Sequence, residues 1–190
     1  MELMDLLKTR RSCRRFCQQP IPQEVIDRIL QAAAWASSAA NLQPLSYVVI
    51  QSEQAVSQIF ELTRWAAYLP KEQGCPKKTE RPVLFIGVIQ NKDISAKCDV
   101  DVGLSVSNMT LSAWNDGVAS CILGAFDRAK VTAFLGLPEI QVVHTLVAFG
   151  YPAQKSILTE VKGGNIKYRL NENGDVVVPK RNIHDITTYR

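Results

Sequence analysis

Apolar residues recur along the chain with two different periods, and the changes between them mark the predicted elements. In residues 24–37, apolar side chains at positions 25, 26, 29, 30, 33 and 34 follow the spacing of one helix face. Residues 82–89 are instead almost wholly apolar, which is typical of a strand buried on both faces. The same criteria predict helices over 2–8, 24–37, 53–68, 95–117 and 127–135, and strands over 47–50, 82–89, 118–125 and 142–149.

Prolines, glycines and polar residues predict the connections between these elements. Residues 37–44 and the Lys-rich stretch 70–81 are expected to be loops, and 171–174 to be the turn of a hairpin between 166–170 and 176–178. The tail, 182–190, is expected to be a short helix or an extended arm. The chain shows no repeat and no linker. Because strands mostly alternate with helices, we expect one domain over residues 1–190, an α+β fold whose one central mixed or antiparallel sheet is flanked by helices.

The composition is that of a soluble globular protein, and it argues against a polyanion-binding or membrane-spanning protein. Hydrophobic residues make up 46% and charged residues 21% of the 190 residues. The formal net charge of +4 is too small for a dedicated polyanion binder. No apolar run approaches the ~20 residues that span a bilayer, and the N-terminus has no signal-peptide pattern. We therefore expect a cytoplasmic protein that has no membrane or nucleic-acid partner.

Side chains that could carry out a reaction by themselves are scarce. The five cysteines are odd in number and scattered, so they suit neither a disulfide framework nor a metal site. His144 lies in an apolar strand, where a core histidine with satisfied hydrogen bonds is expected rather than a catalyst. Hydrolase and nucleotide-binding motifs are missing. We assign no catalytic side chain and no metal ligand, and we expect a bound cofactor to supply the chemistry.

Residues 10–16, Arg-Arg-Ser-Cys-Arg-Arg-Phe, concentrate four guanidinium groups around one hydroxyl. This segment could be a solvated basic turn or nucleic-acid patch, or it could be a phosphate cradle inside a compact domain. Guanidinium groups present paired donors that match phosphate oxygens. No surface aromatic residues are expected to be interleaved around the segment, which argues against nucleic acid. Lys180 and Arg181 form a second concentration of positive charge.

Four segments, in this order along the chain, resemble motifs of the nitroreductase family of FMN-dependent oxidoreductases. They are TRRSCRRF at 9–16, SAANLQP at 38–44, a helix that begins DVG at 101 and contains Asn108, Leu111, Ala113 and Gly117, and GYP at 150–152 followed by VPKR at 178–181. The likeness covers nearly the whole chain.

The resemblance implies three groups of cofactor contacts. Arg10, Arg11, Ser12 and Arg14 match positions that hold the FMN phosphate, ribityl chain and pyrimidine edge, and Lys180 and Arg181 match a C-terminal phosphate clamp. Ser37, Ser38, Ala39 and Asn41, continued by Gln43, match a loop that reaches the flavin from the partner subunit. Cys121, Ile122, Leu123 and Gly124 match a strand end whose backbone lies against the isoalloxazine near N5.

The activity implied by the resemblance is transfer of hydride from NAD(P)H through flavin N5 to an electron-poor small molecule, such as a nitroaromatic or a quinone, by a ping-pong mechanism. The same resemblance implies an obligate homodimer with FMN at its interface. Another specialised redox role on the same fold, or a phosphate-ligand or nucleic-acid binding module, is the alternative. Leu45 stands where many members carry Trp, and residues 65–81 match no family contact, so the acceptor is not assigned.

Overall fold

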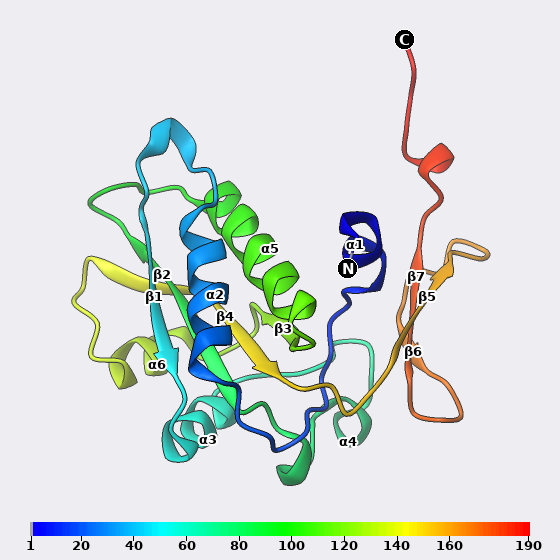
Figure 1. Cartoon of the computed structure of the whole chain (residues 1–190), viewed down its shortest axis with the longest axis horizontal. Coiled ribbons are helices and arrows are strands. Elements are labelled where there is room, and N and C mark those ends of the chain that lie inside the picture. Colours follow the sequence, from blue (N-terminus) through cyan, green and yellow to red (C-terminus); the bar gives the residue numbers. More distant parts are fainter. Residues whose placement is uncertain (1) are drawn as a thin grey trace.

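The computed structural model describes residues 2–190 and contains two β-sheets (Figure 1). The larger sheet has four antiparallel strands in the order β1-β2-β4-β3, and the smaller has three strands in the order β5-β7-β6. The helices are α1 (Leu3–Thr9), α2 (Gln23–Ala34), α3 (Glu53–Glu61), α4 (Lys71–Gly74), α5 (Asp99–Asn115) and α6 (Arg128–Phe134). The strands are β1 (Leu45–Ile50), β2 (Leu84–Asn91), β3 (Ala119–Leu123), β4 (Gln141–Gly150), β5 (Ser156–Glu160), β6 (Arg169–Leu170) and β7 (Val176–Lys180).

Helices cover both faces of the larger sheet, which explains why β2 is apolar throughout. On one face, α2 and α5 bury Ile29 and Met109 in the same cluster as Ile86 of β2. On the other face, α3 and α6 bury Ile59 and Val131 with the neighbouring β2 residue, Phe85. Successive strand residues point to opposite faces, so both sets must be apolar. The predicted two-sided burial of this strand is confirmed.

The smaller sheet corrects the expectation of one central sheet. The predicted hairpin is present, because β6 pairs antiparallel with β7 across the turn at 171–174. However, β7 also pairs in parallel with β5, which the sequence did not indicate. Strand β5 is short and carries polar residues, so it has no distinct pattern of its own. Its hydrogen-bond partners lie about twenty residues further along the chain, as in the pair Ser156 and Val176.

Helix α3 is shorter than the helix predicted over 53–68. The apolar spacing continues beyond its end, but the following backbone bonds to the loop after β3 instead of extending the helix. Asp127 N donates to the Leu62 carbonyl (2.9 Å), and Arg64 N donates to the Ala125 carbonyl (2.8 Å). These tertiary hydrogen bonds outweigh the local helical preference.

The loop expected over 70–81 contains α4 and a short 3-10 turn at Lys78–Glu80, and Gly74 is buried rather than exposed. The tail contains one 3-10 turn, Ile183–Asp185, and is otherwise extended and exposed, within the two predicted possibilities. Within residues 2–190, no helix has the length and apolar character needed to cross a membrane.

The arginine-rich segment 10–16 runs along the free edge of β3. Cys13 N donates to the Ser120 carbonyl (2.9 Å), and Phe16 at the end of the segment is fully buried. The Phe16 ring lies against Gly150, the last residue of β4. The sheet therefore fixes both the edge and the end of this segment, which leaves its arginines outside the core.

Candidate cofactor-binding site

Four residues of the arginine-rich segment (Arg10, Arg11, Ser12 and Arg14) and Lys180 of β7 meet at one cavity of about 210 Å³. Side chains alternate in an extended segment, so Arg10, Ser12 and Arg14 share one side. All three line the cavity with Lys180, at the end of β7. Residues more than 160 positions apart in the sequence are thus brought together at one cavity.

Positive charge dominates this cavity. Among the ion pairs of the described residues, none includes Arg10, Arg14 or Lys180. Burial, followed by the nearby charge of Arg11, lowers the pKa of the Arg10 guanidinium, which nevertheless stays protonated in a protein. Cations without carboxylate partners, two of them partly buried, favour an anion, and a phosphate would accept hydrogen bonds from the guanidinium, hydroxyl and ammonium groups together.

Tyr168 also lines the cavity, and the sequence analysis did not find it. The Arg14 guanidinium carbon lies 4.4 Å from the centroid of the Tyr168 ring, a cation–π contact that orients the arginine. Tyr68 packs on the same ring with centroids 5.1 Å apart, and its backbone N–H donates to the Tyr168 hydroxyl (3.3 Å). Segment 65–81, which matched no family motif, therefore supports the wall of the predicted site through Tyr68.

A second cavity, of about 250 Å³, lies beside the first and shares Arg10 with it. Its lining includes Ile122, which is 46% exposed, whereas Cys121 and Leu123 on either side of it are buried. Burial raises the pKa of the Cys121 thiol to about 11, which keeps it a neutral core residue. Gly124 follows the strand with open space at its Cβ position, so a flat ligand can approach the backbone there.

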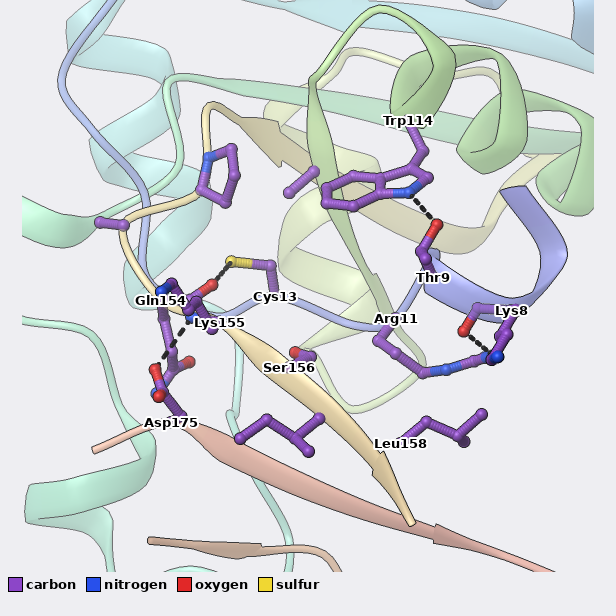
Figure 2. A pocket seen from close by; sticks show the side chains of 14 residues that line it. Lys8, Thr9, Arg11, Cys13, Trp114, Gln154, Lys155, Ser156, Leu158 and Asp175 are labelled. Carbon is purple, nitrogen blue, oxygen red and sulfur yellow. Dashed lines mark hydrogen bonds between the residues drawn. The ribbon is translucent and has the colours of Figure 1, made fainter. Parts of the chain in front are cut away.

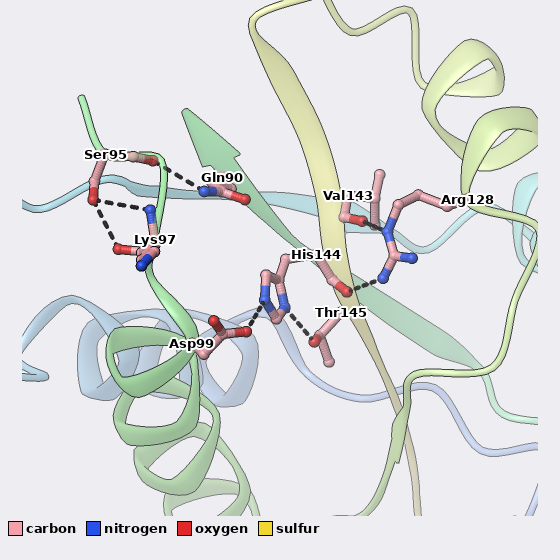
Figure 3. A network of polar contacts seen from close by, with 8 residues as sticks. All are labelled: Gln90, Ser95, Lys97, Asp99, Arg128, Val143, His144 and Thr145. Carbon is pink, nitrogen blue, oxygen red and sulfur yellow. Dashed lines mark hydrogen bonds and ion pairs between the residues drawn. The ribbon is translucent and has the colours of Figure 1, made fainter. Parts of the chain in front are cut away.

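A polar network from β4 and the start of α5 borders this second cavity (Figure 3). His144 Nε2 lies 3.1 Å from Asp99 Oδ1, and His144 Nδ1 lies 3.0 Å from Thr145 Oγ1. Asp99 and Thr145 both line the cavity. His144 has hydrogen-bond partners, as expected, but the expected core position is wrong, because its side chain keeps 26% of its surface exposed.

A β-bulge explains the position of His144. Consecutive residues of β2 pair with Thr145 and then with Val143, so His144 is an extra residue in the β4 ladder. Arg128 donates from Nε to the Val143 carbonyl and from Nη2 to the His144 carbonyl, both at 2.8 Å. The alternating apolar pattern of the strand gives no sign of this extra residue.

Two predicted cofactor residues are placed differently from the rest. Arg11 touches the first cavity, but its Nη2 donates to the carbonyls of Leu7 (2.8 Å) and Lys8 (2.7 Å) at the end of α1. Arg181 is exposed and is not among the residues that line the cavity. Lys180, the residue before Arg181, lines the cavity in its place.

The loop at 37–43 lies away from both cavities within one chain. Ser37, Ser38 and Gln43 line a separate cavity of about 130 Å³, and Ala39 N donates to Asp101 Oδ1 (3.1 Å). The loop holds left-handed backbone at non-glycine residues, with φ of 48° at Ala40, 55° at Asn41 and 52° at Gln43. Such strain clusters at functional sites. The predicted contact of this loop with a partner's flavin remains a prediction.

Comparison with known proteins identifies the family of this chain. The model of the Nitroreductase family matches residues 7–151. An Archaeoglobus fulgidus protein named "Putative NADH dehydrogenase/NAD(P)H nitroreductase" is 29% identical over 80% of this chain and 86% of its own. Iodotyrosine deiodinase 1 of Rattus norvegicus is 25% identical over 85% of this chain and 66% of its own length.

Two solved structures share the fold. A nitroreductase family protein from Streptococcus pneumoniae superposes with a TM-score of 0.72 over the full length of both chains at 17% identity. An FMN-dependent nitroreductase from Clostridium difficile gives a TM-score of 0.65 at 21% identity, over 80% of this chain and 89% of that one. The family model, the named relatives and the antiparallel α+β fold agree. The chain belongs to the nitroreductase family and is an oxidoreductase.

Proposed function

We propose that this oxidoreductase is FMN-dependent and that the cavity between Arg10 and Lys180 holds the FMN phosphate. The observation that carries the proposal is the convergence of Arg10, Ser12, Arg14 and Lys180 on one cavity, without a carboxylate partner among the described ion pairs. Guanidinium, hydroxyl and ammonium donors match the oxygens of a phosphate dianion, so the residues present fit the cofactor. A structural neighbour named as an FMN-dependent nitroreductase supports the same assignment.

The residues around the second cavity position the isoalloxazine in this proposal. Ile122 and Gly124 offer an apolar side chain and an open backbone, and Arg10 supplies positive charge between the two cavities. FMN supplies hydride transfer through N5, from NAD(P)H to an electron-poor acceptor such as a nitroaromatic or a quinone. We assign no general acid or base. Because donor and acceptor would use the same open face in turn, we expect ping-pong kinetics.

We also propose a homodimer in which the partner's loop at 37–43 completes the site. One chain leaves apolar side chains exposed on α1 and α5, namely Leu3 (62%), Met4 (73%), Leu7 (43%), Val100 (73%) and Leu104 (43%). Exposed apolar residues gathered on two helices are typical of an interface. Helix α5 also borders the second cavity, so a partner packed against it would lie close to the flavin.

The visible absorption spectrum of the purified protein, with chromatography of the heat-released chromophore, tests the cofactor assignment. We expect a flavin spectrum and released FMN. A colourless protein that also fails to bind added FMN would refute the proposal and favour a phosphate-ligand module. Stopped-flow mixing with NADH and with NADPH then tests the donor. If neither reduces the bound flavin, the NAD(P)H oxidoreductase assignment is wrong and another redox role is indicated, as the deiodinase relative illustrates.

A further inference from the structure

The cavity with the largest volume among the described residues is not the proposed cofactor site, with which it shares only Arg11 (Figure 2). It has a volume of about 900 Å³ and is enclosed by α1, the end of α5 and the edge strand β5. Cys13 faces it, as alternation along the extended segment requires. A volume of this size falls within the range of small-molecule sites.

One end of this cavity is basic. Lys8 and Arg11 line it together, and neither takes part in an ion pair among the described residues. Arg11 is held in place by the hydrogen bonds of its Nη2 to the end of α1, but its Nε is buried and has no hydrogen-bond partner. The hydrogen bonds to α1 hold the guanidinium in place, so Arg11 presents a fixed positive charge at this end of the cavity.

The other end offers hydrogen-bond acceptors. The amide of Gln154 is oriented by donation from Nε2 to the Gly174 carbonyl (2.7 Å), which leaves its Oε1 buried and without a partner. Asp175 lines the same region and accepts from the Lys155 backbone N–H (3.2 Å). A ligand that reaches this end would therefore present a hydrogen-bond donor.

Apolar walls connect the two ends. Trp114 lies on one side, with its indole oriented by donation from Nε1 to Thr9 Oγ1 (2.8 Å). Ile157 and Leu158 of β5 contribute the other side and are 40% and 38% exposed. An indole face beside aliphatic side chains suits a flat, apolar body.

We propose that this cavity is a second ligand site, for a flat amphipathic organic acid. Its carboxylate binds at Lys8 and Arg11, its ring lies between Trp114 and Leu158, and a hydrogen-bond donor at the far end reaches the Asp175 carboxylate. The residues that would bind this acid differ from those assigned to the flavin, except that Arg11 lines both cavities.

Isothermal titration calorimetry on the full-length protein as purified tests this assignment with three probes. These are 6-amino-2-naphthoate, its uncharged analogue 6-amino-2-naphthamide, and 2-naphthoate, which lacks the amino donor. We expect the aminonaphthoate to bind about tenfold more tightly than the amide and severalfold more tightly than 2-naphthoate, because each analogue loses a hydrogen bond that involves a charged group. Equal affinity for acid and amide, or no binding of the aminonaphthoate at millimolar concentration, would overturn the proposal.

Substitutions of Lys8 locate the binding. Lys8→Gln is expected to weaken aminonaphthoate binding severalfold, whereas Lys8→Arg keeps the charge and the affinity. Lys162→Gln is the matched control, because Lys162 is exposed and lies outside the cavity. An equal loss in Lys8→Gln and Lys162→Gln would mean that the acid binds through general surface charge, which contradicts the assigned site. Flavin absorbance recorded on the same samples shows separately whether the cofactor assignment holds.

Discussion

Gly150→Ala tests how the Gly-Tyr-Pro motif and the arginine-rich segment are joined. A methyl group at residue 150 would lie 2.9 Å from both Cβ and Cδ1 of Phe16 and 3.0 Å from its Cγ. Carbon atoms in contact prefer about 3.5–4.0 Å. Phe16 cannot easily move away, because Phe16 N donates to the Glu80 carbonyl (2.9 Å) and Cys17 N donates to the Tyr151 carbonyl (2.8 Å). The two motifs therefore require each other: a buried ring in one needs a glycine in the other.

The expected cost follows from this overlap. Adding atoms to a packed core costs about 1–3 kcal/mol of folding free energy. The new methyl group would overlap three atoms of Phe16, one of them its Cβ, which side-chain rotation cannot move. We therefore expect Gly150→Ala to cost about 3 kcal/mol, the upper end of this range. This is a large fraction of the roughly 5–15 kcal/mol that stabilises a domain. The overlap would be relieved by moving segment 10–16 away from β3. We therefore expect FMN affinity to fall together with stability.

Urea unfolding and FMN titration measure the two effects, and Gly87→Ala in β2 is the control. A methyl group at residue 87 would meet only side-chain ends, at 3.5 Å from Ile89 and 3.8 Å from Leu135 and Leu146. Its free energy of unfolding should stay near the wild-type value or rise by up to about 1 kcal/mol, because alanine restricts the unfolded chain. If the two alanine variants are equally stable and bind FMN equally well, close packing is not the reason for glycine at residue 150.

Three further predictions concern the cofactor cavity and the core beside it. Arg10→Ala and Arg14→Ala should each weaken FMN binding by about 1.5–3 kcal/mol, the value of a charge-assisted hydrogen bond, and unchanged affinity in both by fluorescence titration would refute the phosphate cradle. Lys180→Ala should raise the Kd for FMN about tenfold and Arg181→Ala much less, since only Lys180 lines the cavity, and the reverse order would show that the clamp is misassigned. Burial raises the pKa of Cys121 from 9.0 to about 11, so the folded protein retains a proton that the unfolded chain loses, and stability should fall as pH rises through this interval, by about 1.4 kcal/mol at pH 10. Cys121→Ala should lack this part of the pH dependence in urea unfolding, and identical slopes would contradict the assignment.

The elements with strong local patterns could be predicted from the sequence. β2 and α5 are found close to their expected places, because long apolar runs and helical spacing reflect burial directly. The end of α3 could not be predicted, since hydrogen bonds from the loop after β3 determine it. β5 was missed for a related reason, because its hydrogen bonds depend on a strand much later in the chain.

For the candidate site too, some residues could be predicted from the sequence and others could not. The arginine-rich segment and Lys180 were identified by charge and motif, and the structure brings them together. Arg11 turns toward α1 because neighbouring side chains of an extended segment point to opposite sides. A sequence motif does not show which side each residue faces. Tyr168 and His144 could not be found from local sequence. One joins the cavity through a cation–π contact with Arg14, and the other is exposed by a bulge that only the strand pairing reveals.

The proposed phosphate cavity is lined by two segments that lie far apart in the sequence, and this determines when during folding the cavity can form. Arg10 is synthesised 170 residues before Lys180, the other wall of the cavity. The larger sheet is complete once β4 has emerged, and can form first, because domains fold as their segments emerge. Under this proposal, the phosphate cavity cannot form until the segment with Lys180 has been synthesised and has folded. A chain that stops after β4 would have the larger sheet and Arg10, Ser12 and Arg14, but it would lack Lys180 on the other side of the phosphate cavity.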